Sequence, residues 1–454
     1  MRVKKGGIFN KIIGLFCKPQ ESSAMLEKLF KLSQHGTNVK TEVMAGLTTF
    51  LTMAYIIFVN PTILADAGMD KGAVFVATCL AAAIGCFIMG FIANYPIALA
   101  PGMGLNAFFT YGVVLGMGYT WQAALGGVFL SGIIFLLLSL FKVREWIINA
   151  IPRTLKLGIA TGIGSFLALI ALKNAGIIVA NPATFVALGD ITEFVPLMSI
   201  IGFFLIAAFT ARNWQGAVMI AVLVMTVIGV VVGDVEYAGL VSAPPSLAPT
   251  FMQMDLKTAL DVSMLSVVFA FLFVDLFDTS GTLIAVTQRA GLTDEKGNIE
   301  RLGKALSSDS VATLSGAALG TSTTTSYIES ASGVAAGGRT GLTAVVVGLL
   351  FVLSIFFSPL AGMIPVYATA GAIFYVAILM LYNLKEINWE DISEAAPVTV
   401  VLLFTPLTFS IAHGITLAFI TYTFIKALTG KFNEITTSVW VLTALFVAKI
   451  AFEV

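Results

Sequence analysis

Long apolar runs separated by short polar breaks fill most of the chain. A helix needs about 20 apolar residues to cross about 30 Å of hydrocarbon, and the runs form two sets of seven around a proline-rich break at residues 242–249. The pattern predicts about 14 membrane segments. The first set covers residues 43–63, 72–93, 97–115, 120–141, 155–173, 195–211 and 216–233. The second set covers residues 259–286, 303–319, 323–337, 340–362, 364–383, 396–412 and 414–428.

A further apolar stretch at residues 436–452 does not fit this count. It is either a terminal interfacial helix or a sign that the preceding boundaries are misplaced. At the other end, residues 9–16 carry apolar side chains on one helical face with lysines nearby. An interfacial amphipathic helix and a basic tail both fit this pattern.

Composition identifies an integral membrane protein. Of the 454 residues, 58% are hydrophobic and 11% are charged, whereas soluble domains are about 45–50% apolar and about 25% charged. The 25 basic and 25 acidic residues balance, which argues against a polybasic nucleic-acid binder. The cysteines Cys17, Cys79 and Cys86 have no disulfide or metal-ligand spacing.

The distribution of Lys and Arg supports the segmentation. Eight basic residues precede the first segment, and further basic residues follow the fourth, sixth, eighth, tenth and twelfth segments. Because cytoplasmic loops collect Lys and Arg, the sequence predicts a multi-pass protein with a cytoplasmic N-terminus. For the basic loops to alternate between the two sides of the membrane in this way, the third and tenth segments must each cross the membrane once.

The third and tenth segments are rich in glycine and small polar residues, at positions 100–109 and 320–338. Neither is expected to form an uninterrupted helix. Interrupted segments at corresponding places in two halves indicate a transporter substrate site near the bilayer midplane. Since each half has seven segments, an odd number, the second half must enter the membrane in the opposite orientation. The sequence therefore predicts an all-α fold of two inverted repeats.

Three acids lie inside predicted segments. Asp275 and Asp278 are the only charges between Asp261 and Arg289, and Glu329 is the only charge between Asp309 and Arg339. A charge at the centre of a membrane helix costs at least about 2.5–3.5 kcal/mol and is a functional candidate by default. No membrane-embedded Lys or Arg is expected to neutralise these acids.

Polar and aromatic residues accompany the acids. Thr279 shares a helical face with Asp275, and Thr325 shares one with Glu329. Asn106, in the third segment, could bind substrate or satisfy freed backbone groups, and Asp278 could instead cap a helix break. Rings such as Phe108 and Phe277 could stack on a flat ligand or belong to ordinary packing. Together these groups describe a pocket for a neutral, planar solute that donates hydrogen bonds.

Four stretches that carry these residues resemble the azaguanine-type purine permease branch of the nucleobase:cation symporter-2 family. They lie at positions 42–61, 100–109, 273–282 and 325–334. The resemblance implies proton-coupled import of purine nucleobases across the bacterial inner membrane, with hypoxanthine and guanine favoured and adenine close. It implies core and gate domains and no enzyme activity. By motif position, it implies substrate and coupling roles for Asn106, Asp275, Asp278 and Glu329.

The resulting hypothesis has four parts. The domains expected are an N-terminal segment at 1–41, core parts at 42–148 and 258–362, and gate parts at 149–257 and 363–454. The partners expected are a purine, a proton and the lipid bilayer; a homodimer is compatible with the sequence. No metal or cofactor is expected, because the transmembrane proton gradient supplies the energy. The predicted substrate-binding residues are Asn106, Phe108, Asp275, Asp278, Thr279, Thr325 and Glu329, with Glu329, Asp275 and Asp278 as the candidates for proton coupling.

Three alternatives stay open at this point. One is a sodium-coupled or broader nucleobase carrier that takes uracil or xanthine. Another is a passive channel, which would equilibrate a substrate without concentrating it. The third is an intramembrane aspartyl protease, which needs two carboxylates flanking one scissile bond, whereas Asp275 and Asp278 lie on one helical face.

Overall fold

The computed structural model describes residues 21–140, 151–293 and 299–452. The side chain of Phe277 and the amphipathic stretch at 9–16 lie outside this description. The elements of the first half are α2 (Glu21–Phe30), η1 (Ser33–His35), α3 (Val39–Met53), α4 (Ile56–Asp66), α5 (Lys71–Ile88), η2 (Met89–Ala93), β1 (Leu99–Pro101), α6 (Met103–Ala107), η3 (Phe108–Val114), α7 (Trp121–Leu140), α9 (Arg153–Asn174), β2 (Ile178–Asn181), β3 (Phe185–Leu188), α10 (Phe194–Ala211) and α11 (Ala217–Val232).

The second half has a similar density of helices. Its elements are α12 (Leu256–Ala259), α13 (Val262–Ala290), α14 (Leu302–Leu319), β4 (Thr324–Ser326), α15 (Ser330–Ala335), α16 (Gly341–Ser354), η4 (Ile355–Phe357), α17 (Ser358–Met363), α18 (Val366–Leu381), η5 (Tyr382–Glu386), α19 (Ile392–Leu407), α20 (Ile411–Leu428), η6 (Phe432–Glu434) and α21 (Thr437–Phe452).

The predicted segments correspond closely to these helices. Nine helices within the described residues are long and apolar enough to cross a membrane, and four shorter apolar helices accompany them. The predicted segment 120–141 is α7, and the segment 216–233 is α11. The first predicted segment comprises α3 and α4, which a tighter turn with helical backbone angles joins at Ala54 and Tyr55, so that Val39–Asp66 is one candidate span. The stretch at 436–452 forms the separate helix α21.

Several helices begin at a polar side chain that satisfies a free backbone N–H group. Asn38 accepts a hydrogen bond from Thr41 N at the start of α3, and Asp70 accepts one from Ala73 N at the start of α5. The first turn of a helix has no intrahelical acceptor for its N–H groups, so such caps stabilise the start. These residues therefore fix where the two helices begin.

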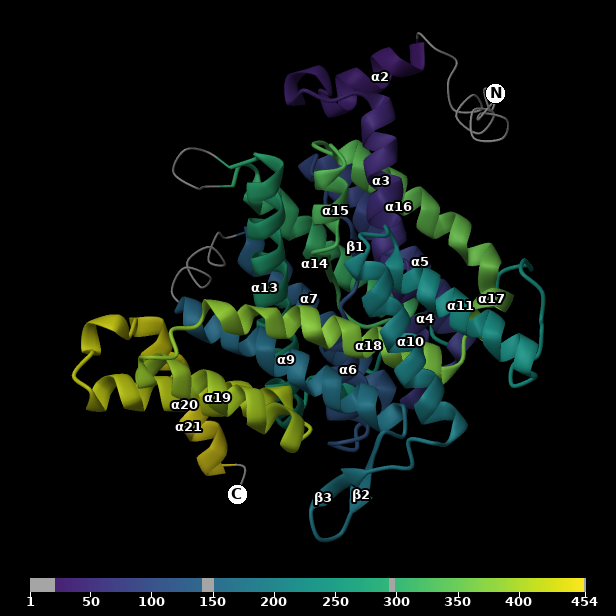
Figure 1. Ribbon diagram of the computed structural model, residues 1–454. Coiled ribbons are helices and arrows are strands. Elements are labelled where there is room, and N and C mark those ends of the chain that lie inside the picture. The colour runs from purple at the N-terminus through teal and green to yellow at the C-terminus, as the bar shows by residue number, and fades with distance from the viewer. Residues whose placement is uncertain (1–20, 141–150, 294–298, 453–454) are drawn as a thin grey trace.

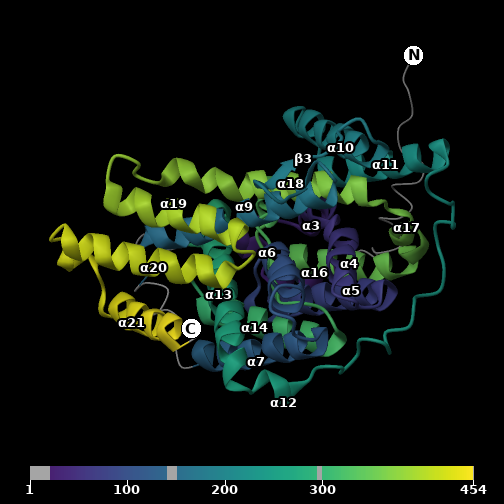
Figure 2. The same ribbon diagram turned by 90° about the horizontal axis from the view of Figure 1, so that it is seen from below.

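The helices pack in two groups, each containing helices from both halves of the chain. In one group, α16 packs on α3 and α5, and α14 packs on α5 and α7. In the other, α9 packs on α18 and α19, and α10 packs on α11 and α18. Figure 1 shows α3 and α13 upright, whereas α9, α18 and α19 run crosswise in the lower part of the view. Figure 2 shows α19, α20 and α21 at one side, away from α4 and α5.

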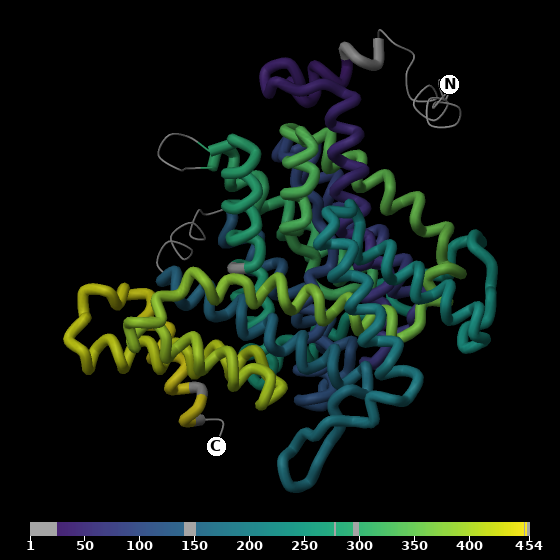
Figure 3. The backbone as a smooth tube through the Cα atoms, viewed as in Figure 1, coloured from purple at the N-terminus to yellow at the C-terminus, as the bar shows by residue number. Residues whose placement is uncertain are grey.

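The path of the backbone shows how the halves interleave. In Figure 3 the purple α3 lies beside the green α16, and the blue-green α9 lies beside the yellow-green α18 and α19. The hairpin β2–β3 projects from the body of the protein in the same view. Assigning the two packing groups to moving core and gate domains, with the boundaries given above, stays a prediction, as does the inverted relation of the halves.

Candidate functional site

The two interrupted segments meet through their backbones. Strands β1 and β4 pair antiparallel, with Ala100 opposite Thr325. Hydrogen bonds from Gly102 N to Thr323 O, at 2.9 Å, and from Tyr327 N to Ala98 O, also at 2.9 Å, extend the pairing on both sides. Unpaired backbone groups are costly inside a membrane, so each segment supplies the partner that the other lacks. The short helices α6 and α15 continue from this crossing.

A hydroxyl on α13 links the crossing to neighbouring acids. Thr279 is fully buried, and its Oγ1 lies 2.8 Å from Asp309 Oδ2 and 2.6 Å from Thr325 Oγ1. A hydroxyl has one proton to donate. When Thr279 donates it to the Asp309 carboxylate, Thr325 is the donor to Thr279. These contacts connect α13, α14 and β4.

Asp309 of α14 is the main acid that the sequence analysis missed. Its side chain is fully buried, and Oδ1 accepts hydrogen bonds from Ser326 N at 3.0 Å and Ser326 Oγ at 3.2 Å. It thus holds the end of β4 as well as Thr279. Its position inside the predicted segment 303–319 was the available signal, because any charge within a membrane segment is a functional candidate.

Asp275 and Asp278 have different environments on α13. Asp275 is 1% exposed, and its two carboxylate oxygens lie 3.4 Å from the hydroxyls of Thr279 and Thr313. Asp278 is partly exposed and lies beside Gly102, just after β1. It is also within electrostatic range of Asp309 and Glu329, both of which repel a charge on it. Asp275 is therefore enclosed, whereas Asp278 faces accessible space.

Glu329 lies between β4 and α15 and is partly exposed. Its Oε1 accepts a hydrogen bond of 2.5 Å from the hydroxyl of Tyr55, at the turn between α3 and α4. The neighbouring Tyr327 donates its hydroxyl to Pro101 O, also at 2.5 Å. The first predicted segment thus contributes to the site through Tyr55, which the sequence analysis did not select.

Asn106 and Phe108 lie on the other side of the crossing. Ser322 donates its hydroxyl to Asn106 Oδ1, and Asn106 Nδ2 is a buried donor with no hydrogen-bond partner among the described residues. Buried donors are nearly always paired, so Nδ2 is available to a ligand or a water molecule. The Phe108 ring is fully buried and packs edge-on against Phe271, with 5.1 Å between centroids. This contact favours the packing interpretation of Phe108.

The structure therefore gathers the predicted residues around one strand crossing. We call the following set the polar centre: Asn106, Asp275, Asp278, Thr279, Asp309, Thr325 and Glu329. It contains four carboxyl groups from α13, α14 and the tenth segment. Like charges this close in a low-dielectric region disfavour complete ionisation of the set. The arrangement can hold a ligand with several N–H groups and can exchange a proton.

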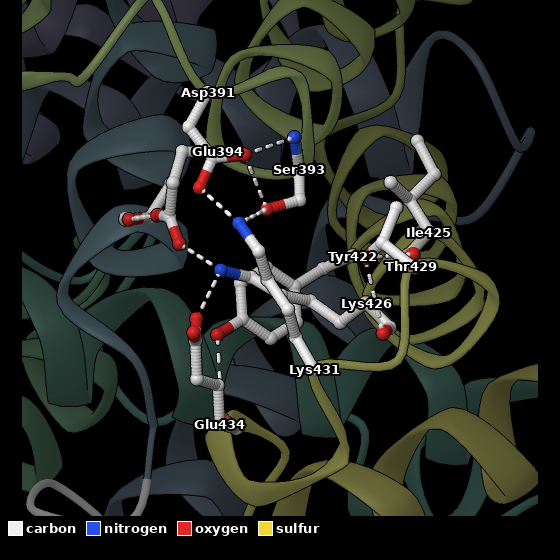
Figure 4. Close-up of polar contacts among 10 residues, drawn as sticks. Asp391, Ser393, Glu394, Tyr422, Ile425, Lys426, Thr429, Lys431 and Glu434 are labelled. Atoms are coloured by element: carbon white, nitrogen blue, oxygen red, sulfur yellow. Dashed lines mark hydrogen bonds and ion pairs between the residues drawn. The ribbon is translucent and has the colours of Figure 1, made fainter.

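A buried cation does exist in the chain, but it is paired away from the polar centre. The side chain of Lys426 in α20 has no exposed surface, and its ammonium contacts Glu394 and Glu434. Beside it, Lys431 contacts Asp391 at 2.5 Å (Figure 4). The hydrogen bond from Lys431 holds the pKa of Asp391 below its usual range. This cluster joins α19, α20 and η6 and occupies the second packing group.

A strand crossing with buried acids, set among apolar helices long enough to span a bilayer, defines a membrane transporter rather than an enzyme. The chain belongs to the Permease family, which it matches over residues 40–420.

Similar proteins agree with this assignment. Adenine permease AdeP of Escherichia coli is 52% identical over 428 residues, which cover 94% of this chain and 96% of AdeP. Guanine/hypoxanthine permease PbuG of Bacillus subtilis is 46% identical over 422 residues, which cover 90% of this chain and 96% of PbuG. The family resemblance inferred from the motifs is therefore confirmed.

The fold is also found among solved structures. The transmembrane domain of the cyanobacterial bicarbonate transporter BicA superposes with a TM-score of 0.63 at 16% identity, covering 84% of this chain and 97% of that domain. At this identity the likeness concerns the fold alone. The expected multi-pass helical transporter fold is confirmed.

Proposed function

We propose that this protein imports purine nucleobases together with protons across the bacterial inner membrane, with its N-terminus in the cytoplasm. The observation that carries the proposal is the crowding of four carboxyl groups in the polar centre. Because such a set disfavours complete ionisation, binding of a neutral ligand through these acids is readily linked to proton exchange. Nucleobase transport by this family supports the choice of substrate.

The polar centre suggests a division of roles. Asp278 and Glu329 are partly exposed acceptors suited to purine N–H groups, and Asn106 Nδ2 is a donor suited to a ring nitrogen or a carbonyl oxygen. Asp275 and Thr279 are enclosed by other polar side chains. We therefore propose that the first three contact the base, whereas Asp275, Thr279 and Thr325 hold the site in shape.

Proton coupling is proposed for Glu329, with Asp278 and Asp275 as the further candidates. A partly exposed carboxyl can exchange a proton with water more easily than an enclosed one. The gradient would drive accumulation when the proton and the base enter together and leave together. Relative movement of the two packing groups would provide alternating access to the polar centre.

Adenine is proposed as the preferred base, ahead of guanine and hypoxanthine. This order reverses the expectation from the motifs alone. It rests on the higher identity to an adenine permease, 52%, than to a guanine/hypoxanthine permease, 46%.

The test is uptake of radiolabelled bases in a bacterial strain that lacks purine transport. We expect accumulation above the external concentration, inhibition by a protonophore, and stronger competition by adenine than by guanine, hypoxanthine, xanthine or uracil. A Glu329→Gln variant should lose pH-driven accumulation. Uptake that survives the protonophore but requires sodium would reject proton coupling, and equilibration without accumulation would indicate a channel.

A further inference from the structure

Tyr55 lies at a tighter turn in the first membrane segment. Helix α3 ends at Met53 and α4 begins at Ile56, which leaves Tyr55 at the turn between them. The tyrosine is 2% exposed, and its hydroxyl lies 2.5 Å from Glu329 Oε1. One turn earlier, Thr52 Oγ1 lies 2.9 Å from Ser332 Oγ of α15. The end of α3 is therefore fixed against α15 at two points, and one of them is the Glu329 carboxylate.

The chemistry of this contact depends on the protonation of Glu329. An ionised carboxylate only accepts hydrogen bonds, and a neutral tyrosine hydroxyl can donate one. A charge-assisted bond of this kind is about twice as strong as a neutral one. When Glu329 takes up a proton, the strong bond becomes an ordinary one. Tyr55 therefore stabilises the ionised form of Glu329 over the protonated form.

Other titratable groups near Glu329 act on it through their charge, whereas Tyr327 does not donate a hydrogen bond to it. Asp278 and Tyr327 lie within electrostatic range of Glu329. Tyr327 and Tyr375 of α18 lie within electrostatic range of Tyr55. The hydroxyl of Tyr327 is given to Pro101 O instead of to Glu329.

We propose that Tyr55 is a positioning residue that holds the Glu329 carboxylate ready for the purine and sets the pH range in which the carrier exchanges its proton. The proposal rests on the proposed function for its physiological meaning, whereas the contact itself has consequences without substrate. During transport, Glu329 would alternate between a protonated and an ionised form, and the Tyr55 hydroxyl favours the ionised form. Removal of the hydroxyl should therefore let Glu329 keep its proton at higher pH.

The first experiment needs no substrate. Purified wild type, Tyr55→Phe and Tyr327→Phe are unfolded by heat in detergent across about pH 5–9, and the same tyrosine changes are repeated with Glu329→Gln. Because the Tyr55 bond favours the ionised acid, the melting-temperature difference between wild type and Tyr55→Phe should grow as pH rises. It should become independent of pH when residue 329 is Gln. Tyr327→Phe serves as the matched control, since it removes a neighbouring buried hydroxyl that does not reach Glu329.

The second experiment measures initial uptake rates over the same pH range with a base that the wild type transports. The alkaline limit of uptake should move up by about half to one pH unit in Tyr55→Phe, the shift that corresponds to the difference between a charge-assisted hydrogen bond and an ordinary one. Tyr327→Phe should keep the wild-type limit even if its maximal rate falls. Tyr55→Met, with a flexible apolar side chain, replaces Tyr55→Phe if the latter does not reach the membrane.

The outcomes separate the two proposals. If the melting-temperature difference does not change with pH, or is the same with Gln at position 329, the role of Tyr55 is wrong whatever is transported. If that difference behaves as expected but no purine accumulates in the wild type, the proposed function is wrong and the Tyr55–Glu329 linkage stands.

Discussion

Replacement of Thr279 by valine is the sharpest test of the polar centre. Valine keeps the branched shape of threonine and removes only the hydroxyl, which in the wild type contacts Asp309 at 2.8 Å and Thr325 at 2.6 Å. The variant deprives a fully buried carboxylate of a donor and leaves the Thr325 hydroxyl without its acceptor. We expect the carboxyl groups on α13 and α14 to be held less firmly in their positions relative to one another.

The size of the effect follows from these two bonds. A hydrogen bond to a charged acceptor contributes about 1.5–3 kcal/mol, and a neutral one about 0.5–1.5 kcal/mol. The contact with Asp275 at 3.4 Å adds little, because the single hydroxyl proton is already used. Allowing for partial relaxation, we expect a loss of about 2 kcal/mol, which is about 30-fold in Vmax/KM for uptake at about 1.4 kcal/mol per factor of ten.

The assay is initial uptake of a radiolabelled purine, divided by the amount of protein in the membrane. Thr279→Ser is the matched control, because it keeps the hydroxyl, and it should stay within about threefold of wild type. A Thr279→Val carrier that works within about threefold of wild type would refute the positioning role. A lower melting temperature with unchanged uptake per molecule would show that the network serves stability alone.

Three further predictions concern packing and charge outside the acids of the polar centre. A methyl group at Gly104 of α6 would overlap Cγ2 of Ile163 in α9, so Gly104→Ala should lower the maximal uptake rate severalfold; Gly303→Ala, where the added methyl meets open space, should not. Lys426→Met should lower the melting temperature in detergent by about 3 °C or more, because it removes the buried ammonium between Glu394, which is 19% exposed, and Glu434, which is 51% exposed; an unchanged melting curve would contradict this. Glu42→Gln should destabilise the purified protein by about 1–3 kcal/mol, because the buried carboxylate accepts bonds from three backbone N–H groups and one hydroxyl at the start of α16; chemical unfolding with an unshifted midpoint would count against it.

Hydrophobic periodicity was sufficient to find most of the fold. A membrane helix is a local feature whose length is set by the bilayer, so segments such as α7 and α11 are visible in the sequence. The tighter turn at Tyr55 was not visible, because Ala54 and Tyr55 are compatible with a regular helix. The pairing of β1 with β4 was also missed. It joins residues more than 200 positions apart. Within each segment, the sequence shows only that residues favouring a helix are scarce.

The candidate site was partly predictable for a related reason. Isolated charges in apolar segments stand out, which selected Asp275, Asp278 and Glu329. Asp309 is less conspicuous, because it bounds the charge-free stretch on one side of Glu329, although it lies inside the predicted segment 303–319. Tyr55 carries no charge and follows an ordinary apolar pattern. Its contact with Glu329 depends on how α3 packs against α15, which one sequence does not reveal.

The antiparallel pairing of β1 with β4 also constrains how the protein is made. Roughly 220 residues separate Pro101 from its partner Thr324, and ribosomes add about 5–20 residues per second. The first strand must therefore wait about 10–45 s in the membrane before its partner has been synthesised. During that interval its backbone N–H and C=O groups need temporary partners, such as water, lipid headgroups or the insertion machinery. The polar centre therefore cannot form until the second half of the chain has been synthesised, and a truncated first half cannot assemble it.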